Sequence, residues 1–214
     1  MSALEIDQPV PLAAEQPPVS IPVFTYSLQP LQNYAETCRI EGAFSRDEIA
    51  RILALTHDVP VEEATLGTNR SIDVTHRRSR VRWVNLAPDN VWIFQRLSDL
   101  TWNVNKARYQ YDLTGFHEGL QVAEYGPGAF FNWHKDHGPG QHTTRKLSIT
   151  VQLSDESDYE GGTMEFLHGP QIEQASKAIG TAIIFPSYVM HRVTEVTAGV
   201  RRSIVAWVAG PPYR

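Results

Sequence analysis

The chain has 214 residues, 42% of them hydrophobic and 20% charged, which is typical of a globular protein with one large domain and a buried core. Its formal net charge of -5 provides no basic excess for binding a phosphate backbone, so a nucleic-acid partner is disfavoured. The single cysteine, Cys38, excludes an intrachain disulfide and is expected to be a small buried residue.

The N-terminal stretch MSALEIDQPV has acidic residues where a signal peptide would carry lysine or arginine. No uninterrupted apolar run of about 18 residues, the length needed to cross a membrane, occurs in the sequence. We therefore expect a cytoplasmic protein with no membrane partner. Nothing in the sequence indicates the oligomeric state.

Six prolines fall within residues 1–30. Proline at this density is incompatible with a helix or a central strand, so these residues are predicted to form an extended N-terminal arm. Residues 31–214 are predicted to form a single domain, with helical support in 45–110 and a core of strands in 119–210.

Two helices are predicted in the first half of the chain. The sequence from Ser45 to Glu48 has the form of a capping box, and apolar residues follow at helical spacing, which predicts a helix at about 46–57. Apolar residues also recur every three or four positions within 90–108, which predicts an amphipathic helix that lies on a sheet. Between them, RSRVRWVNL (78–86) has the alternation of a β-strand.

Beyond residue 115 the helical period is lost, and short strand candidates alternate with turn residues. The predicted strands are 120–125, 129–134, 146–153, 163–167, 181–185, 190–195 and 203–208. Strands at such close spacing predict an α+β, mainly β domain of the sandwich, jelly-roll or barrel type, with the helices packed outside.

Within FFNWHKDHGPG, His134 and Asp136 are separated by one residue, so on an extended strand they project to the same side and can bind one ion. His191, at the beginning of a later strand, supplies a third ligand. Two imidazoles and one carboxylate form the facial triad of non-haem Fe(II) oxygenases, and the near absence of thiolate disfavours a closed zinc site. The alternative is that both histidines are surface residues or satisfied core residues.

Arg201 lies ten residues after His191, following a turn at Ala198 and Gly199, at the start of an apolar strand. Ser203 and Trp207 share its face of that strand. A guanidinium there needs an anion, and the far carboxylate of a dicarboxylate cosubstrate provides one, with a further bond from Ser203. The alternative is a solvated arginine at a strand end.

Three longer segments occur in the order and at the intervals found in the Fe(II)/2-oxoglutarate dioxygenases. They are YGPGAFFNWHKD, RKLSITVQLSDESDYEGGTMEF and GTAIIFPSYVMHRVTEVTAGVRRSIVAW. The chain from Gln121 onward resembles the double-stranded β-helix (jelly-roll) core of this superfamily. The resemblance is closest to its prolyl 4-hydroxylase-like branch, which includes the PKHD-type hydroxylases.

The resemblance implies a role for each residue that matches a motif. His134, Asp136 and His191 match the iron ligands, Arg201 matches the residue that binds the C5 carboxylate of 2-oxoglutarate, and Tyr125 matches a tyrosine that hydrogen-bonds this cosubstrate. Arg145 and Trp207 match positions near the pocket of the substrate, and Trp133 is a further candidate there. Phe131 and Gln152 depart from the pattern, because each replaces a tyrosine of some relatives.

The implied reaction is hydroxylation of an unactivated C–H bond that uses Fe(II), 2-oxoglutarate and O2 and releases succinate and CO2, with ascorbate as a candidate reductant. The implied substrate is a prolyl residue of a peptide or protein, a free amino acid or another small molecule. One alternative is a nucleic-acid demethylase of the same superfamily, which usually has a second arginine where this chain has Trp207. The other is a non-catalytic, cupin-like metal-binding or sensor protein.

Overall fold

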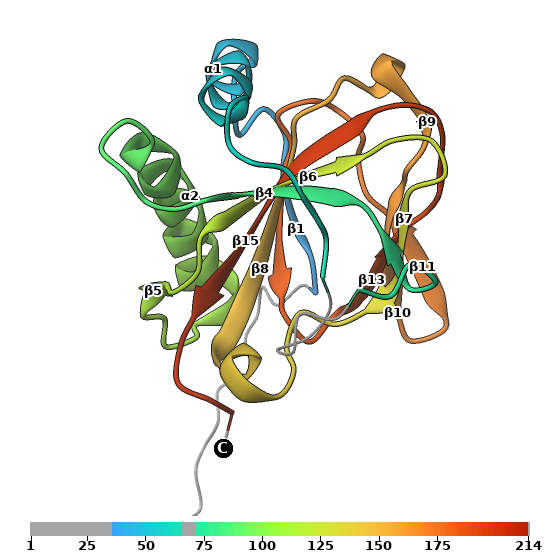
Figure 1. Cartoon of the computed structure of the whole chain (residues 1–214). Coiled ribbons are helices and arrows are strands. Elements are labelled where there is room, and N and C mark those ends of the chain that lie inside the picture. The colour runs from blue at the N-terminus through green and yellow to red at the C-terminus, as the bar shows by residue number, and fades with distance from the viewer. Residues whose placement is uncertain (1–35, 66–71, 214) are drawn as a thin grey trace, which may run out of the picture. The chain divides into compact units, whose positions relative to one another are not determined.

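The computed structural model describes residues 36–65 and 72–213, and within them the strands form two main antiparallel sheets (Figure 1). The larger sheet has the spatial order β1 (Cys38–Ile40), β12 (Ala182–Pro186), β8 (Arg145–Gln152), β15 (Arg201–Ala209), β6 (Leu120–Tyr125), β4 (Arg80–Val84) and β2 (Glu62–Glu63), and β5 (Gly115–Phe116) pairs with β15. The arm predicted for residues 1–30 lies outside the described residues.

The smaller sheet has the order β11 (Gln171–Gln174), β10 (Met164–His168), β13 (Met190–Val193), β7 (Phe130–His134) and β3 (Arg77–Arg78). A separate pair is formed by β9 (Tyr159–Gly161) and β14 (Val196–Gly199). This mainly β architecture with two α-helices confirms the fold class predicted from the sequence. No helix in the described ranges is long and apolar enough to cross a membrane.

The helix α1 (Arg46–Thr56) begins at the predicted capping box. The Ser45 hydroxyl accepts a hydrogen bond from the Glu48 amide (3.2 Å), and the Glu48 carboxylate accepts one from the Ser45 amide (2.7 Å). The helix α2 (Val91–Val104) continues into a π-helical turn, Asn105–Tyr109. Both helices lie where the apolar periodicity predicts them.

The main core lies between the two helices and one face of the larger sheet (Figure 1). Strands β8 and β15 place alternate apolar residues on this face, and in register Ile204 is opposite Val151 and Ala206 is opposite Ile149. The other face of the same strands carries polar side chains, with Ser203 opposite Gln152. The alternation therefore separates a helix-covered apolar face from a polar face that is available for a site.

Three details differ from the sequence predictions. The segment 78–86 is not one strand, because β3 and β4 pair in different sheets and the chain changes sheets at Ser79. Ala198 and Gly199 end β14, so the predicted turn is displaced, although Gly199 keeps a left-handed φ of 72°. Cys38 is half-buried, because it belongs to the edge strand β1.

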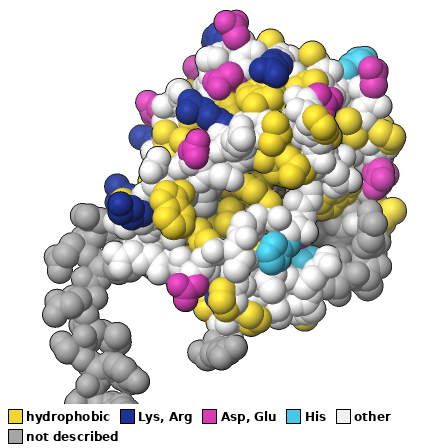
Figure 2. Space-filling model, turned by 90° about the vertical axis from the view of Figure 1, so that its left-hand side faces the viewer, with side chains coloured by type: hydrophobic (Ala, Val, Ile, Leu, Met, Phe, Trp, Pro, Cys, Tyr) yellow, Lys and Arg dark blue, Asp and Glu magenta, His cyan; other side chains and the backbone are white. Residues whose placement is uncertain are grey.

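Hydrophobic, basic and acidic side chains are interspersed on the face of the molecule that Figure 2 shows. This mixture of signs is what a chain with 19 basic and 24 acidic residues produces when its charges are spread over the surface. A face of this kind provides no extended stripe of positive charge for a phosphate backbone.

Candidate active site

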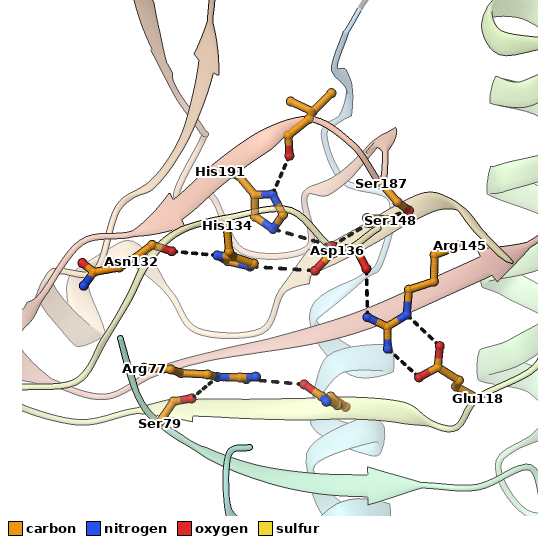
Figure 3. Close-up of polar contacts among 12 residues, drawn as sticks. Arg77, Ser79, Glu118, Asn132, His134, Asp136, Arg145, Ser148, Ser187 and His191 are labelled. Atoms are coloured by element: carbon orange, nitrogen blue, oxygen red, sulfur yellow. Dashed lines mark hydrogen bonds and ion pairs between the residues drawn. The ribbon is translucent and has the colours of Figure 1, made fainter. Parts of the chain in front are cut away.

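Three potential metal ligands converge at one end of the smaller sheet (Figure 3). His134 ends β7 and lies directly opposite His191 of β13 in the strand register. Asp136 follows two residues after His134, and one ligand atom from each of the three side chains lies within 4.8 Å of the others. The three residues come together as predicted, but β7 ends at His134, so Asp136 is placed by the bend that follows the strand and not by alternation along it. Among the described residues, this is the group of histidines and carboxylates whose spacing suits a metal ion.

The position of Asp136 is set by hydrogen bonds from outside its own strand. The amides of Asp136 and His137 both donate to the Ser187 carbonyl (3.0 and 2.9 Å), which ties this loop to the turn before β13. The Ser148 hydroxyl, from β8 of the larger sheet, donates to the Asp136 carboxylate (2.6 Å). Asp136 is thus held through its backbone by the turn before β13 and through its carboxylate by the larger sheet.

The two imidazoles are held in the tautomer that a metal requires. The Nδ1 atom of His134 lies 2.7 Å from the Asn132 carbonyl, and that of His191 lies 2.9 Å from the Val189 carbonyl. Since a carbonyl oxygen can only accept, each Nδ1 carries the proton and each Nε2 presents a lone pair to the site. These Nε2 atoms lie 3.8 and 3.6 Å from the Asp136 carboxylate, too far for a hydrogen bond. A cation between them is the group that this donor set fits.

The protonation states agree with this arrangement. Burial and then the neighbouring His191 lower the pKa of His134 well below its usual value, so its imidazole is neutral near pH 7. Burial acts to raise the pKa of Asp136, but electrostatic interactions with His191, His134 and Arg145 and the Ser148 hydrogen bond lower this pKa to about 2. A neutral His134 imidazole and an ionised Asp136 carboxylate are forms that bind metals.

Arg201 lies in the larger sheet, opposite Tyr125 in the register of β15 and β6. Its side chain is buried, donates to the Ser203 hydroxyl (3.2 Å) and lies over the Tyr125 ring, with 5.4 Å from the guanidinium carbon to the ring centroid. In the part of the chain that the structure describes, no carboxylate forms an ion pair with Arg201. A buried guanidinium without a carboxylate is a binding group for an anion.

A second tyrosine beside Arg201 has no sequence signal. The Tyr159 hydroxyl accepts a hydrogen bond from Gln152 (2.9 Å), and burial raises the pKa of Tyr159, an effect that the nearby Arg201 opposes. The resemblance described above places a tyrosine of some relatives at the position of Gln152. In this chain the phenol beside Gln152 is that of Tyr159, which belongs to β9. The pairing of β9 with β14 brings it there, and such a pairing cannot be inferred from local motifs.

A cavity of about 720 Å³ opens beside the ligands and is lined from both sheets. Its lining includes His134, Asp136, His191, Arg201, Ser203, Tyr125, Arg145 and Trp207. The predicted site residues therefore surround one space, with one exception. Trp133 does not line the cavity, and it packs against Arg192 with 4.7 Å between the guanidinium carbon and the ring centroid. The pairing of β7 with β13 is irregular around this residue, so Phe131 lines the cavity although Trp133 does not.

Arg145 differs from Arg201 because it has a carboxylate partner. Its guanidinium donates two hydrogen bonds to Glu118 (2.7 and 2.5 Å) and a third to the Asp136 carbonyl (3.3 Å). It also lies flat over the Trp207 ring, 3.7 Å from the centroid. His137 and His142 line the cavity as well, but neither belongs to the ligand group.

Comparison with known proteins shows a similarity over the segment that carries the three potential metal ligands and Arg201. Residues 120–209 match the model of the 2OG-Fe(II) oxygenase superfamily. The chain is 41% identical over 93 residues to a PKHD-type hydroxylase from Synechococcus sp. (strain CC9902), a match that covers 42% of this chain and 39% of that protein. The resemblance inferred from the motifs is thus confirmed over this segment. The matched segment spans about two fifths of the length of such curated relatives.

Solved structures extend the likeness in fold to most of the chain. A prolyl-4-hydroxylase from Pseudomonas putida aligns with a TM-score of 0.65 and 19% identity, covering 82% of this chain and 93% of that one. A prolyl hydroxylase from Trichoplax adhaerens, in complex with a peptide fragment of the hypoxia inducible factor oxygen degradation domain, aligns with a TM-score of 0.69 and 17% identity, covering 81% and 83%. The likeness supports the jelly-roll fold.

Proposed function

We propose that this chain, whose residues 120–209 match the 2OG-Fe(II) oxygenase superfamily, is an Fe(II)- and 2-oxoglutarate-dependent oxygenase that hydroxylates an unactivated C–H bond. The observation that carries the proposal is the combination of two groups in one cavity. One is the set of three ligands His134, Asp136 and His191, and the other is the buried Arg201. A metal site alone would suit many proteins, whereas the added anion site suits a dicarboxylate cosubstrate.

His134, Asp136 and His191 would hold Fe(II) in this proposal. When bound, Fe(II) and 2-oxoglutarate supply the activation of O2 and the hydroxylation chemistry, with succinate and CO2 as co-products. The protein holds the ligands in the required protonation states through the Asn132 and Val189 carbonyls, and Ser148 orients the carboxylate. Three protein ligands leave the other coordination positions open for small molecules.

Arg201 would bind the C5 carboxylate of 2-oxoglutarate, assisted by Ser203 and Tyr125. The guanidinium is positioned before binding by the Ser203 hydroxyl and by its contact with the Tyr125 ring, so little side-chain entropy is lost when the anion binds. Because Arg201 belongs to the larger sheet and the ligand histidines belong to the smaller one, a dicarboxylate can extend across the cavity between them.

The substrate would be a prolyl residue of a peptide or a free amino acid. The prolyl hydroxylase of Trichoplax adhaerens, which has the same fold, is in complex with a peptide. In this chain, Arg145 and Trp207 form the part of the cavity wall next to Asp136, stacked on each other. We assign Arg145 and Trp207, but not Trp133, to the substrate side of the cavity.

The test is optical. Anaerobic addition of Fe(II) and 2-oxoglutarate to the protein is expected to produce a visible charge-transfer band, and Arg201→Ala is expected to weaken the binding of 2-oxoglutarate seen in this band. Arg202→Ala is the matched control, because Arg202 lies on the other face of β15 and pairs with Glu124. Absence of the band, together with absence of 2-oxoglutarate turnover with peptides, amino acids and cell extract, would contradict the proposal.

A further inference from the structure

Three arginines line the cavity of the described domain, and they differ in how their charge is balanced. Arg145 is paired with Glu118 through two hydrogen bonds. Arg201 is assigned above to the cosubstrate. The third, Arg77 of β3, has no role in the proposed function, although its side chain is as buried as that of Arg145, with 7% of each residue exposed.

The contacts of Arg77 are made with neutral groups. Its Nε donates to the Ser79 hydroxyl (2.8 Å) and a terminal nitrogen donates to the Gln121 carbonyl oxygen (3.4 Å). Its guanidinium carbon lies over the Phe131 ring, 4.5 Å from the centroid. No carboxylate in the ranges 36–65 and 72–213 forms an ion pair with it. A guanidinium has five N–H groups, so three of them have no protein acceptor among these contacts.

Arg77 lies close to the metal ligands. It is opposite Phe131 in the register of β3 and β7, and the Phe131 ring is stacked on the His134 imidazole with 3.4 Å between centroids. Figure 3 shows the guanidinium extending below His134 toward the interior of the site. Arg77 and Arg201 come from strands of different sheets, and both line the cavity.

We propose that Arg77 binds a carboxylate of the substrate that is hydroxylated, and that this substrate is a small carboxylic acid such as a free amino or imino acid. The inference rests on the proposed function, because it takes Arg201 to be used by the cosubstrate. A buried guanidinium without a carboxylate is costly, and a bidentate carboxylate satisfies both its charge and its free N–H groups. Ser79, Gln121 and Phe131 hold the guanidinium in place, as a binding group requires.

Binding can be measured without turnover. The full chain is loaded with Mn(II) and 2-oxoglutarate without O2, and the proteinogenic L-amino acids are titrated calorimetrically, each as the free acid and as the primary amide. We expect at least one acid to bind about 10- to 100-fold more tightly than its amide, the range expected when a charged hydrogen-bonding partner is lost. Arg77→Met should remove this difference, and Arg77→Lys should restore part of it.

Arg78→Met is the matched control, because Arg78 is the exposed neighbour in β3 and contacts the Gly128 carbonyl at 3.5 Å. It should preserve the preference for the acid. A second set of peptides ending in proline, with a free or an amidated C-terminus, separates the two sources of a carboxylate. If these peptides show the preference and no amino acid does, the binding of a substrate carboxylate by Arg77 is supported, but the identification of the substrate as a free amino acid is refuted.

The inference is overturned if no acid or peptide binds more tightly than its amide, or if Arg77→Met leaves this preference intact. It is also overturned if Arg77→Met weakens the binding of 2-oxoglutarate and not the binding of the acid. If Arg77→Met does not fold, the test is the comparison of wild type with Arg77→Lys. Lysine keeps the charge but loses the planar, two-pronged geometry of the guanidinium, so the preference for the acid over the amide should be smaller in Arg77→Lys. The charge-transfer band of the wild type keeps the two proposals separable. A band without acid preference refutes the role of Arg77, whereas a missing band together with missing 2-oxoglutarate turnover refutes the oxygenase.

Discussion

Replacing Ser148 by alanine is expected to weaken metal binding about tenfold without removing any ligand. The Ser148 hydroxyl is fully buried and donates to the Asp136 carboxylate at 2.6 Å. A hydrogen bond to a charged group contributes about 1.5–3 kcal/mol, which corresponds to a change in Kd of roughly 10- to 150-fold. The lower value applies here, because the charge of Arg145 continues to act on Asp136, and the Ser187 hydroxyl lies 3.0 Å from that of Ser148.

The assay is calorimetric titration of the metal-free protein with Mn(II) or Co(II). The matched control is Ser154→Ala, since Ser154 is also buried and its hydroxyl bonds to backbone groups, the Val200 carbonyl (3.1 Å) and the Arg202 amide (2.7 Å). This variant should lose stability but keep its metal affinity. An unchanged Kd in Ser148→Ala, or an equal loss in Ser154→Ala, would refute the view that the Ser148 hydrogen bond orients the ligand.

Three further predictions concern stability. Glu118→Ala leaves the buried Arg145 without its carboxylate partner and should lower the free energy of unfolding by about 3 kcal/mol. The thermal unfolding midpoint should then fall by roughly 6–12 °C. Adding Arg145→Met should recover part of this stability, and no recovery would contradict the pairing. Burial acts to raise the pKa of Glu124, but hydrogen bonds and charges from Arg202 and Arg80 lower it overall, below its usual value of 4.5. The ionised Glu124 therefore stabilises the fold above pH 4.5, and this contribution is lost as the pH falls through the pKa of Glu124 in the folded state. Urea unfolding at a series of acidic pH values should therefore show a shallower acid loss in Glu124→Gln, and an unchanged slope would count against this account. Ser45→Ala removes the cap of α1 and should cost about 1 kcal/mol in the same unfolding assay, whereas Ser45→Asp should not.

The metal ligands could be predicted because their geometry is local. His134 ends β7 and Asp136 follows it two residues later, just beyond the strand, and the only distant step is the pairing of β7 with β13, which brings His191 opposite His134. Arg201 was recognisable for a similar reason, since a charged residue on an apolar strand stands out. The roles of these residues as iron and cosubstrate ligands remain predictions that the experiments above address.

Arg77 and Tyr159 could not be predicted, because their positions depend on tertiary structure. The sequence around Ser79 keeps the period of a single strand while the chain passes from one sheet to the other, so nothing local indicates that Arg77 enters the cavity. Tyr159 reaches Arg201 through a short strand with little apolar content. Trp133 shows the opposite case, since the sequence makes it a candidate for the substrate pocket, whereas its side chain packs against Arg192.

The division of the site between two sheets has a consequence for the choice of oxo acid. Arg201 belongs to the larger sheet and the two ligand histidines belong to the smaller one, while Ser148 and Arg145 of the larger sheet both bond to Asp136. In the proposed function, a dicarboxylate must reach from the three ligands to Arg201, so the packing of the two sheets against each other would set the carbon-chain length that fits. Substitutions at contacts between the sheets are therefore a route to altering the preference among four-, five- and six-carbon oxo acids.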